Sequence, residues 1–247
     1  MAADPRKRQK KLERRAAKRQ DKKHRLVKEQ HAGLAERLTA ASRYPVLHSW
    51  ALEDLWTEGI GQVVISRELP DGSVAFGAFL VDRYCLGVKD AFGNVVGRSE
   101  YENKLVRDTR SHFAVREVSP ATVRKLVEEA VAYAASLGLS PHADYHKVKP
   151  IFGTIDPGES TEEFEFGKDG KPYFFAGPHD TPERCRQILA VLAHSRGPDG
   201  FHYTIPAFAN LDQVLPDALK HGRARLIRPD PQGSLLDVPM DFDNEGT

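Results

Sequence analysis

The stretch QVVISRELPDGSVAFGAFLVD, residues 62–82, carries the clearest structural pattern in this 247-residue chain. Two runs rich in Val, Ile and Phe, residues 62–69 and 73–82, flank the turn-forming triplet Pro-Asp-Gly at residues 70–72. Strand-forming runs on either side of such a triplet are typical of a β-hairpin. We therefore expect two well-buried antiparallel strands here.

A long helix is predicted further along the chain. Ser119 and Pro120 favour the first turn of a helix, and Gly138 favours the left-handed residue that ends one. Between them, apolar residues repeat at helical spacing and form one continuous face, which should lie on the sheet. These residues are Val123, Leu126, Val127, Ala130, Val131, Ala134 and Leu137.

Shorter segments are predicted with less regular patterns. Residues 50–56 indicate a helical or irregular segment that covers the core. Ser99 and Glu102 have the spacing of a capping box, which predicts a short helix to about residue 107. Residues 113–118 indicate a strand.

A second hairpin is predicted from residues 162–166 and 172–176, because Asp-Gly within the linking residues 168–171 suits a tight turn. Another helix is expected to begin at Thr181 and Pro182. Strand pairs separated by helices favour an α+β body, in which a mostly antiparallel sheet is covered by helices.

Charge divides the chain into three parts. Residues 1–30 carry 13 Lys or Arg against 4 acidic residues, a net charge of +9, whereas the whole chain has a net charge of only +1. We therefore distinguish a basic arm (residues 1–30), a globular body (residues 31–228) and an acidic tail (residues 229–247), for which we expect disorder. The arm's cations are Arg6, Lys7, Arg8, Lys10, Lys11, Arg14, Arg15, Lys18, Arg19, Lys22, Lys23, Arg25 and Lys28.

The composition of the arm favours a solvated or fluctuating helix, because Leu12 is its only large apolar residue from residue 2 to 25. An apolar stripe begins where the arm reaches the body and predicts a docked helix; it comprises Val27, His31, Leu34, Leu38 and Ala41. Dense cations with little apolar surface are suited to a polyanion. RNA, a ribosomal surface or DNA is therefore the expected partner, while a purely solubilising role, acidic proteins, anionic lipid and nuclear import stay open.

Other features bear on the compartment. The longest apolar runs are too short for a membrane span, and no secretory signal pattern follows the basic N-terminus. Cys85 and Cys185 are the only cysteines, and a single disulfide could not organise a chain of this length. We expect a cytoplasmic protein with no membrane partner.

Reactive residue types are densest at residues 82–90, where Asp82, Tyr84, Cys85, Lys89 and Asp90 form a candidate polar site. Lys89 is a conceivable partner for a nucleophilic cysteine, although core filling is the stronger interpretation of Cys85.

Two metal hypotheses follow from the acidic residues and histidines. Asp82, Asp90 and Asp156 could gather magnesium for phosphodiester cleavage. Alternatively, His142 and His146, with Asp144 between them, could bind a metal if a third ligand came from Asp156, His179 or Asp180. The chain contains no phosphate-binding loop, dinucleotide fingerprint or serine-elbow motif.

Three segments are distinctive: FLVDRYCLGVKDAF (residues 79–92), LSPHADY (139–145) and FEFGKDGKPYFFAGPHD (164–180). They resemble a family of uncharacterised bacterial proteins over roughly residues 58–195. The resemblance implies a bacterial cytosolic origin and a shared fold, and it carries no activity, cofactor or active site. The arm lies outside the resembling stretches.

The leading functional hypothesis is a protein that the basic arm holds on RNA, a ribosome or DNA. The first alternative is a metal-dependent hydrolase or nuclease with a site near Asp82 to Asp90. The second alternative is a module that binds a protein partner, for which an exposed apolar patch on the body would be the sign.

Overall fold

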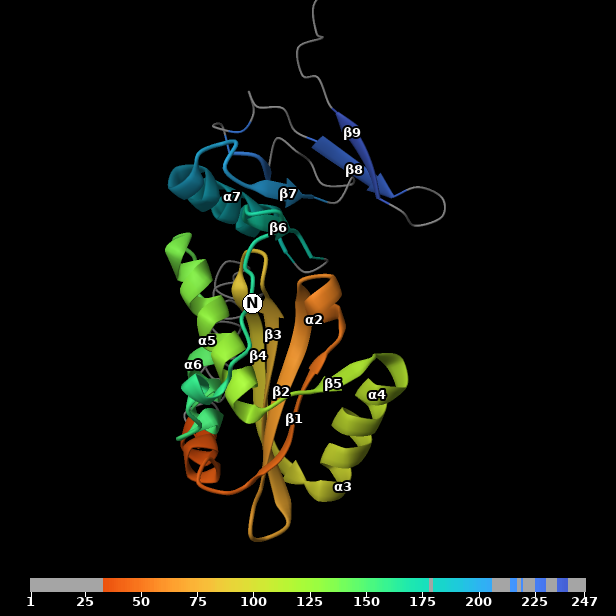
Figure 1. Ribbon diagram of the computed structural model, residues 1–247, viewed down its shortest axis with the longest axis vertical. Helices are drawn as coiled ribbons and strands as arrows, with labels where there is room; N and C mark the ends of the chain where they lie inside the picture. Colours follow the sequence, from red (N-terminus) through yellow and green to blue (C-terminus); the bar gives the residue numbers. More distant parts are fainter. Residues whose placement is uncertain are drawn as a thin grey trace, which may run out of the picture.

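The computed structural model describes residues 33–177, 180–205, 214–216 and 219, together with the backbone of residues 225–229 and 235–239. Over these residues the protein is an α+β fold built on a five-stranded antiparallel sheet in the order β4-β3-β2-β1-β5 (Figure 1). The predicted fold class is therefore confirmed. The strands are β1 (Val46–Leu52), β2 (Ile60–Glu68), β3 (Ser73–Asp82), β4 (Gly87–Gly97) and β5 (Val115–Glu117).

The predicted hairpin of residues 62–82 lies at the centre of this sheet as strands β2 and β3. The Leu69 amide closes its turn by donating to the Ser73 carbonyl at 2.9 Å. Successive side chains of a strand point to opposite faces, and here both faces are buried, with Val63 on one side and Val64 on the other. Burial on both faces explains the nearly continuous apolar runs.

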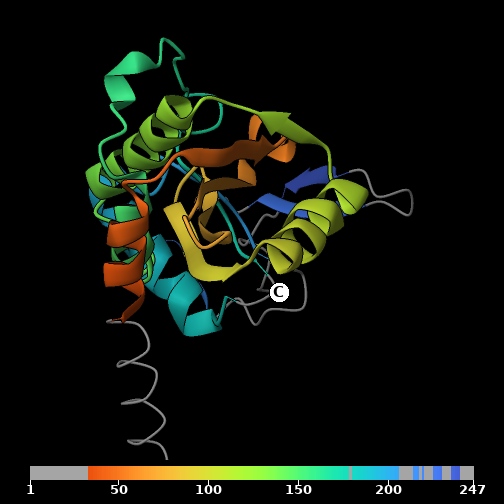
Figure 2. The ribbon, with the colours of Figure 1, turned by 90° about the horizontal axis from the view of Figure 1, so that it is seen from below.

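Helices cover one face of the sheet (Figures 1 and 2). They are the helix of residues 33–41, α5 (Pro120–Ser136), α6 (Tyr145–Val148) and the 3₁₀ turn η2 (Lys149–Phe152). The helix α5 begins as predicted, because the Ser119 hydroxyl accepts a hydrogen bond from the Thr122 amide at 3.0 Å. Leu38 and Ala41 are buried against the same core, which confirms the predicted docking for the described part of the stripe. Val27 and His31 lie outside the described residues.

The opposite face is covered by one helix made of three consecutive segments: α3 (Arg98–Glu100), the π-helical η1 (Tyr101–Arg107) and α4 (Asp108–His112). Leu105 of this helix packs against a cluster that contains Trp50 and Val64. The predicted capping box is wrong, because Gly97 precedes the helix and no side chain caps it. Ser99 instead accepts a hydrogen bond from Asn103 one turn later.

The prediction for residues 50–56 is partly wrong, because β1 extends to Leu52 and only the short helix α2 (Asp54–Thr57) follows. Trp50 and Leu52 point to the α3–α4 side, whereas Ala51 points to the α5 side. The strand predicted at residues 113–118 is confirmed as β5.

A second, smaller core lies beyond the β3–β4 turn. It is built by α7 (Pro182–Arg196), which begins as predicted, and by two short strands, β6 (Tyr173–Phe175) and β7 (His202–Thr204). The predicted second hairpin is wrong: residues 162–166 form no strand, and β6 pairs in parallel with β7. The Asp-Gly turn itself forms, with Lys168 and Lys171 bridged and Asp169 at a positive φ of 52°.

Near the C-terminus, β8 (Arg225–Pro229) and β9 (Leu235–Pro239) pair antiparallel. The expected disordered tail therefore includes β9 and the last residue of β8, and its residues 230–234 and 240–247 lie outside the described part of the chain. All of the basic arm also lies outside it. Among the described residues, no helix combines the length and the apolar character that a membrane span requires.

Candidate functional site

Asp82 organises the turn that joins β3 to β4. Its side chain is fully buried, and its carboxylate accepts hydrogen bonds from the backbone amides of Tyr84 (2.9 Å), Cys85 (3.0 Å) and Leu86 (3.2 Å). Burial raises the pKa of Asp82 to about 6, and the three hydrogen bonds oppose this rise. Asp82 therefore holds the turn and is not accessible to a substrate.

Tyr84 and Cys85 lie within this turn and are committed to packing. The Tyr84 ring covers Gly59 so closely that a Cβ at position 59 would lie 2.2 Å from it, and its centroid is 6.4 Å from that of Tyr173. Cys85 is fully buried in the second core. Burial raises the pKa of its thiol, and the Asp82 carboxylate acts in the same direction, so the nucleophilic thiolate is disfavoured.

Lys89 and Asp90 follow in β4, where the pairing with β3 shifts register. Leu80 pairs with Asp90 and Val81 pairs with Val88, so Lys89 is the extra residue of a β-bulge. The Lys89 ammonium lies 2.8 Å from Asp180, close to the start of α7. The Asp90 carboxylate is largely exposed and accepts the amide of its neighbour Ala91 at 2.8 Å.

These five side chains do not converge on one cleft: Asp82 and Cys85 are buried, Lys89 is paired with Asp180, and Asp90 faces solvent. The third acid of the magnesium hypothesis, Asp156, caps the 3₁₀ turn η3 (Pro157–Glu159) by accepting the Gly158 amide at 2.8 Å.

The histidine-rich turn is also arranged for local bonding. His142 Nδ1 lies 3.5 Å from Asp90 and 3.7 Å from Asp144, and His146 is exposed on α6. His179 lies outside the described residues. In the described part of the chain, no group of three His, Cys, Asp or Glu side chains is placed to hold a metal ion.

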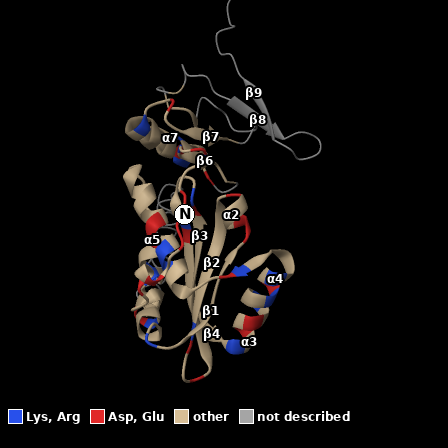
Figure 3. Ribbon diagram, viewed as in Figure 1, with Lys and Arg blue, Asp and Glu red and all other residues tan. Residues whose placement is uncertain are grey.

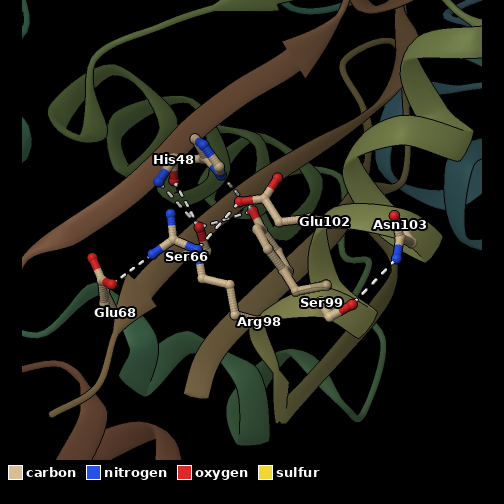
Figure 4. Close-up of polar contacts among 8 residues, drawn as sticks. His48, Ser66, Glu68, Arg98, Ser99, Glu102 and Asn103 are labelled. Atoms are coloured by element: carbon tan, nitrogen blue, oxygen red, sulfur yellow. Dashed lines mark hydrogen bonds and ion pairs between the residues drawn. The ribbon is translucent and has the colours of Figure 1, made fainter. Parts of the chain in front are cut away.

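Sequence reasoning missed a polar network beneath the α3–α4 helix (Figure 4). The Tyr101 hydroxyl donates to Ser66 Oγ at 2.9 Å and lies 3.2 Å from His48 Nδ1, while Ser66 Oγ also accepts the His48 amide at 3.1 Å. Ser66 and Tyr101 are both buried, and burial raises the pKa of Tyr101. Only a lone serine inside the apolar run of β2 hinted at this network. The network joins β1, β2 and Tyr101, the first residue of η1, so we assign it a role in stability.

We predict that Tyr101→Phe lowers the free energy of unfolding by about 1.5 kcal/mol, because Ser66 and His48 each lose a buried hydrogen-bonding partner. Urea denaturation followed by circular dichroism measures the change. The control is Tyr44→Phe, which removes the hydroxyl of a ring that is 37% exposed and should change stability by less than about 0.5 kcal/mol. Equal effects of the two substitutions would contradict the assignment.

Charges on the described body are mixed, with Lys and Arg interspersed among Asp and Glu (Figure 3). Many of the body's cations pair with carboxylates of the same chain, including Arg98 with Glu68, Arg110 with Glu117, and Arg116 with Glu53. These three arginines are therefore opposed by carboxylates of the same chain. The arm's cations, from Arg6 to Arg25 and Lys28, lie outside the described residues.

Four large apolar side chains are exposed among the described residues: Tyr44, Phe92, Phe113 and Phe175. They come from four different segments, namely the residues before β1, strand β4, the end of α4 and strand β6. Phe92 also packs edge-on against Phe76, with centroids 5.5 Å apart. Their separation along the chain gives no argument for a single apolar docking patch.

Comparison with known proteins adds nothing to this picture, since no family model, no curated protein and no solved structure matches the chain. Any function must therefore be argued from the charge, the geometry and the chemistry of the chain itself.

Proposed function

We propose that this is a nucleic-acid-binding protein that associates with RNA, including ribosomal RNA, or with DNA through its basic arm. The observation that carries the proposal is the concentration of charge: residues 1–30 hold a net charge of +9 in a chain whose total is +1. A phosphate backbone would relieve the mutual repulsion of 13 cations and release its own counterions. The arm's own 4 acidic residues are too few to neutralise its 13 cations.

The body serves as the anchor of the arm in this proposal. The helix of residues 33–41, which continues from the arm, packs on the sheet through Leu34 and Leu38. Arg37 adds a hydrogen bond to the Val95 carbonyl of the edge strand β4 at 3.3 Å. The arm is therefore attached close to a fixed point on the body, whereas residues 31–228 have a net charge of −3 and supply no comparable excess of cations.

Recognition through the arm should follow charge and not base sequence. Residues 1–30 contain no Phe, Tyr or Trp, so they lack the side chains on which unpaired bases stack. Both cysteines are free thiols, which suits the cytoplasm, where RNA and DNA are abundant in bacteria.

We predict that six substitutions in the arm weaken binding strongly in the full-length protein. Changing Lys10, Lys11, Arg14, Arg15, Lys18 and Arg19 to Gln lowers the arm's net charge from +9 to +3. If the unsubstituted arm contacts about six phosphates, its affinity for duplex DNA should fall about 10³-fold between 50 and 200 mM salt. Fluorescence anisotropy with a labelled duplex and a labelled single-stranded RNA measures the affinity and its salt slope.

The matched control removes the same charge from the body, by changing Arg43, Lys104, Arg107, Arg110, Lys168 and Arg196 to Gln. This variant should keep the steep salt slope, whereas the arm variant should lose most of it. If both variants lost affinity equally, binding would depend on the overall charge of the protein and not on the arm. Undetectable binding of the unsubstituted protein to both nucleic acids at low salt would end the proposal.

A further inference from the structure

A cavity of about 520 Å³ lies between the start of β4, the segment that links α5 to α6, and the first half of α7. It is distinct from the arm and from the α3–α4 network. Segments far apart in the sequence meet here, and two of the three distinctive segments, residues 79–92 and 139–145, supply its walls. Its lining residues are Leu86, Val88, Lys89, Gly138, Leu139, Ser140, Pro141, His142, Ala143, Arg184, Gln187, Ile188 and Val191.

The charged side chains that line this cavity are basic. Lys89 and Arg184 line it, and both pair with Asp180, at 2.8 and 3.2 Å, whereas Asp180 itself is not a lining residue. The Asp180 side chain is only 4% exposed. Burial by itself would raise the pKa of Asp180, but hydrogen bonds from Lys89 and the Gly177 amide hold that pKa below its ordinary value. One ionised carboxylate thus pairs with two cations, so the cluster of Lys89, Asp180 and Arg184 carries a net charge of +1. The carboxylates of Asp90 and Asp144 lie 3.5 and 3.7 Å from Nδ1 of the lining residue His142 and are not lining residues themselves.

Both cations keep hydrogen-bond donors for a ligand. Asp180 engages the Nε of Arg184, and within the described residues no protein acceptor bonds its two terminal nitrogens. That fork of N–H groups matches the two oxygens of a carboxylate or a phosphate. The β-bulge at Lys89 places its ammonium on the same side, near Asp180.

The rest of the cavity combines an apolar wall with the polar residues Ser140, His142 and Gln187. Leu86 and Val88 come from the β3–β4 region, Leu139 from the linking segment, and Ile188 and Val191 from α7. Gly138 lets the linking segment pass close to α7, because its φ is +84° and a Cβ there would lie 3.2 Å from Val191. An apolar wall beside a positively charged edge fits a ligand that has both an apolar body and an anionic group.

We propose that this cavity binds a small organic anion, whose carboxylate or phosphate is held by Arg184 and Lys89 and whose apolar part lies on Leu139, Ile188 and Val191. The carboxylate and phosphate classes share this recognition chemistry. The proposal is independent of nucleic-acid binding, because none of the lining residues belongs to the arm.

The test is an NMR titration of the full-length, ¹⁵N-labelled protein with benzoate, phenyl phosphate and benzamide. Benzamide has nearly the shape of benzoate but no charge, so it isolates the contribution of the anion. We expect the two anions to bind with dissociation constants of about 1 mM or below and to shift the backbone amides of Lys89, Ser140 and Arg184. Benzamide should bind at least about tenfold more weakly. A preference between the two anions assigns the ligand class.

Arg184→Gln should weaken benzoate binding at least about tenfold and leave benzamide binding unchanged. Its matched control is Arg196→Gln, at the opposite end of α7 and outside the lining, which should bind benzoate as the unsubstituted protein does. Both arginines are exposed, so folding should be preserved. The proposal is overturned if no anion shifts these amides at about 10 mM, if benzamide binds as well as benzoate, or if the two arginine variants behave alike. Shifts confined to residues 1–30 would also overturn it, since they would report ion binding by the arm alone.

Discussion

Asp82→Ala is expected to lower the free energy of unfolding by about 3 kcal/mol at neutral pH. The substitution leaves the amides of Tyr84, Cys85 and Leu86 without the carboxylate that accepts from all three. The substitution also removes a buried charge, and this removal by itself would stabilise the folded state. The loss of acceptors should outweigh this gain, because Cys85 and Leu86 are buried and water cannot replace the carboxylate.

The control for this substitution is Asp90→Ala, eight residues away on the same hairpin. The Asp90 side chain is 63% exposed, accepts the amide of Ala91 and lies 3.5 Å from His142 Nδ1 at the surface, so its removal should cost less than about 1 kcal/mol. Urea denaturation of both variants measures the difference. A smaller effect for Asp82→Ala than for Asp90→Ala would show that the carboxylate does not hold the turn.

The raised pKa of Asp82 adds a pH dependence of definite sign. Because the pKa is about 6 in the folded protein and 3.8 ordinarily, the folded state binds the proton more tightly than the unfolded state. This group therefore stabilises the fold increasingly as the pH falls from 7.5 to 4.5, by about 2 kcal/mol. Asp82→Asn cannot titrate, so the difference in unfolding free energy between the two proteins should change by that amount. A constant difference over this range would contradict the pKa.

Local sequence patterns predicted the elements whose structure depends mainly on residues close to them in the sequence. The β2–β3 hairpin and α5 were predicted because turn residues, strand propensity and helical periodicity agree over long stretches. The Asp169-Gly170 turn was predicted for the same reason, since its backbone requires positive φ at both residues, and these are 52° and 77°.

Pairing between distant segments was not predictable in this way. The strand expected at residues 162–166 is absent. The Phe166 side chain of this segment instead packs on α5, where its ring is stacked on that of Tyr133 with centroids 5.3 Å apart. The Glu165 carbonyl accepts two hydrogen bonds from the Arg83 guanidinium. In a strand, this carbonyl would instead accept from the backbone amide of a neighbouring strand. Strand β6 finds its partner in β7, about 30 residues later, and nothing in the local sequence indicates that parallel pairing.

The candidate site shows the same limit. Asp82, Cys85 and Lys89 are close in sequence and were therefore predicted to share a site. In the structure, Asp82 bonds to the amides of a turn, Cys85 is buried in the second core, and Lys89 forms an ion pair with Asp180. The cavity at Arg184 was invisible to the sequence, because it arises only when α7 packs beside the bulged start of β4. The five acidic residues of the tail likewise predicted disorder, although its Val238 is a strand-favouring residue and lies in β9.

Arg67→Met should have a still larger effect on stability than Asp82→Ala, lowering the free energy of unfolding by about 4 kcal/mol. Arg67 lies in β2 and is 6% exposed, and burial lowers its pKa. Its guanidinium donates to three backbone carbonyls, those of Tyr44 (2.8 Å), Ile151 (3.2 Å) and Phe152 (2.9 Å). Within the described residues, no carboxylate forms an ion pair with it, so these carbonyls are its compensation for burial.

Methionine fills a similar volume without donors, so the variant removes the guanidinium from the Tyr44 and Ile151 carbonyls inside the protein. The Phe152 carbonyl loses one of two donors and keeps the Ile155 amide at 3.2 Å. Arg67→Lys keeps the charge but can reach fewer carbonyls, because an ammonium lacks the planar fork, and it should cost about 2 kcal/mol. The control is Arg98→Met, whose side chain is 44% exposed and pairs with Glu68 at the surface, with an expected loss below about 1 kcal/mol.

Hydrogen exchange gives a second measurement that distinguishes a local from a general effect. Arg67 ties the turn η2 and the residues before β1 to the central strand, so its loss should speed exchange at Gly153 and Tyr44, whose amides bond within those two segments. Amides of the β2–β3 ladder should change only as far as global stability falls. If Arg67→Met is no more destabilising than Arg98→Met, the guanidinium does not join these segments, and their attachment rests on the apolar contacts of Ile151 and Phe152 with the core.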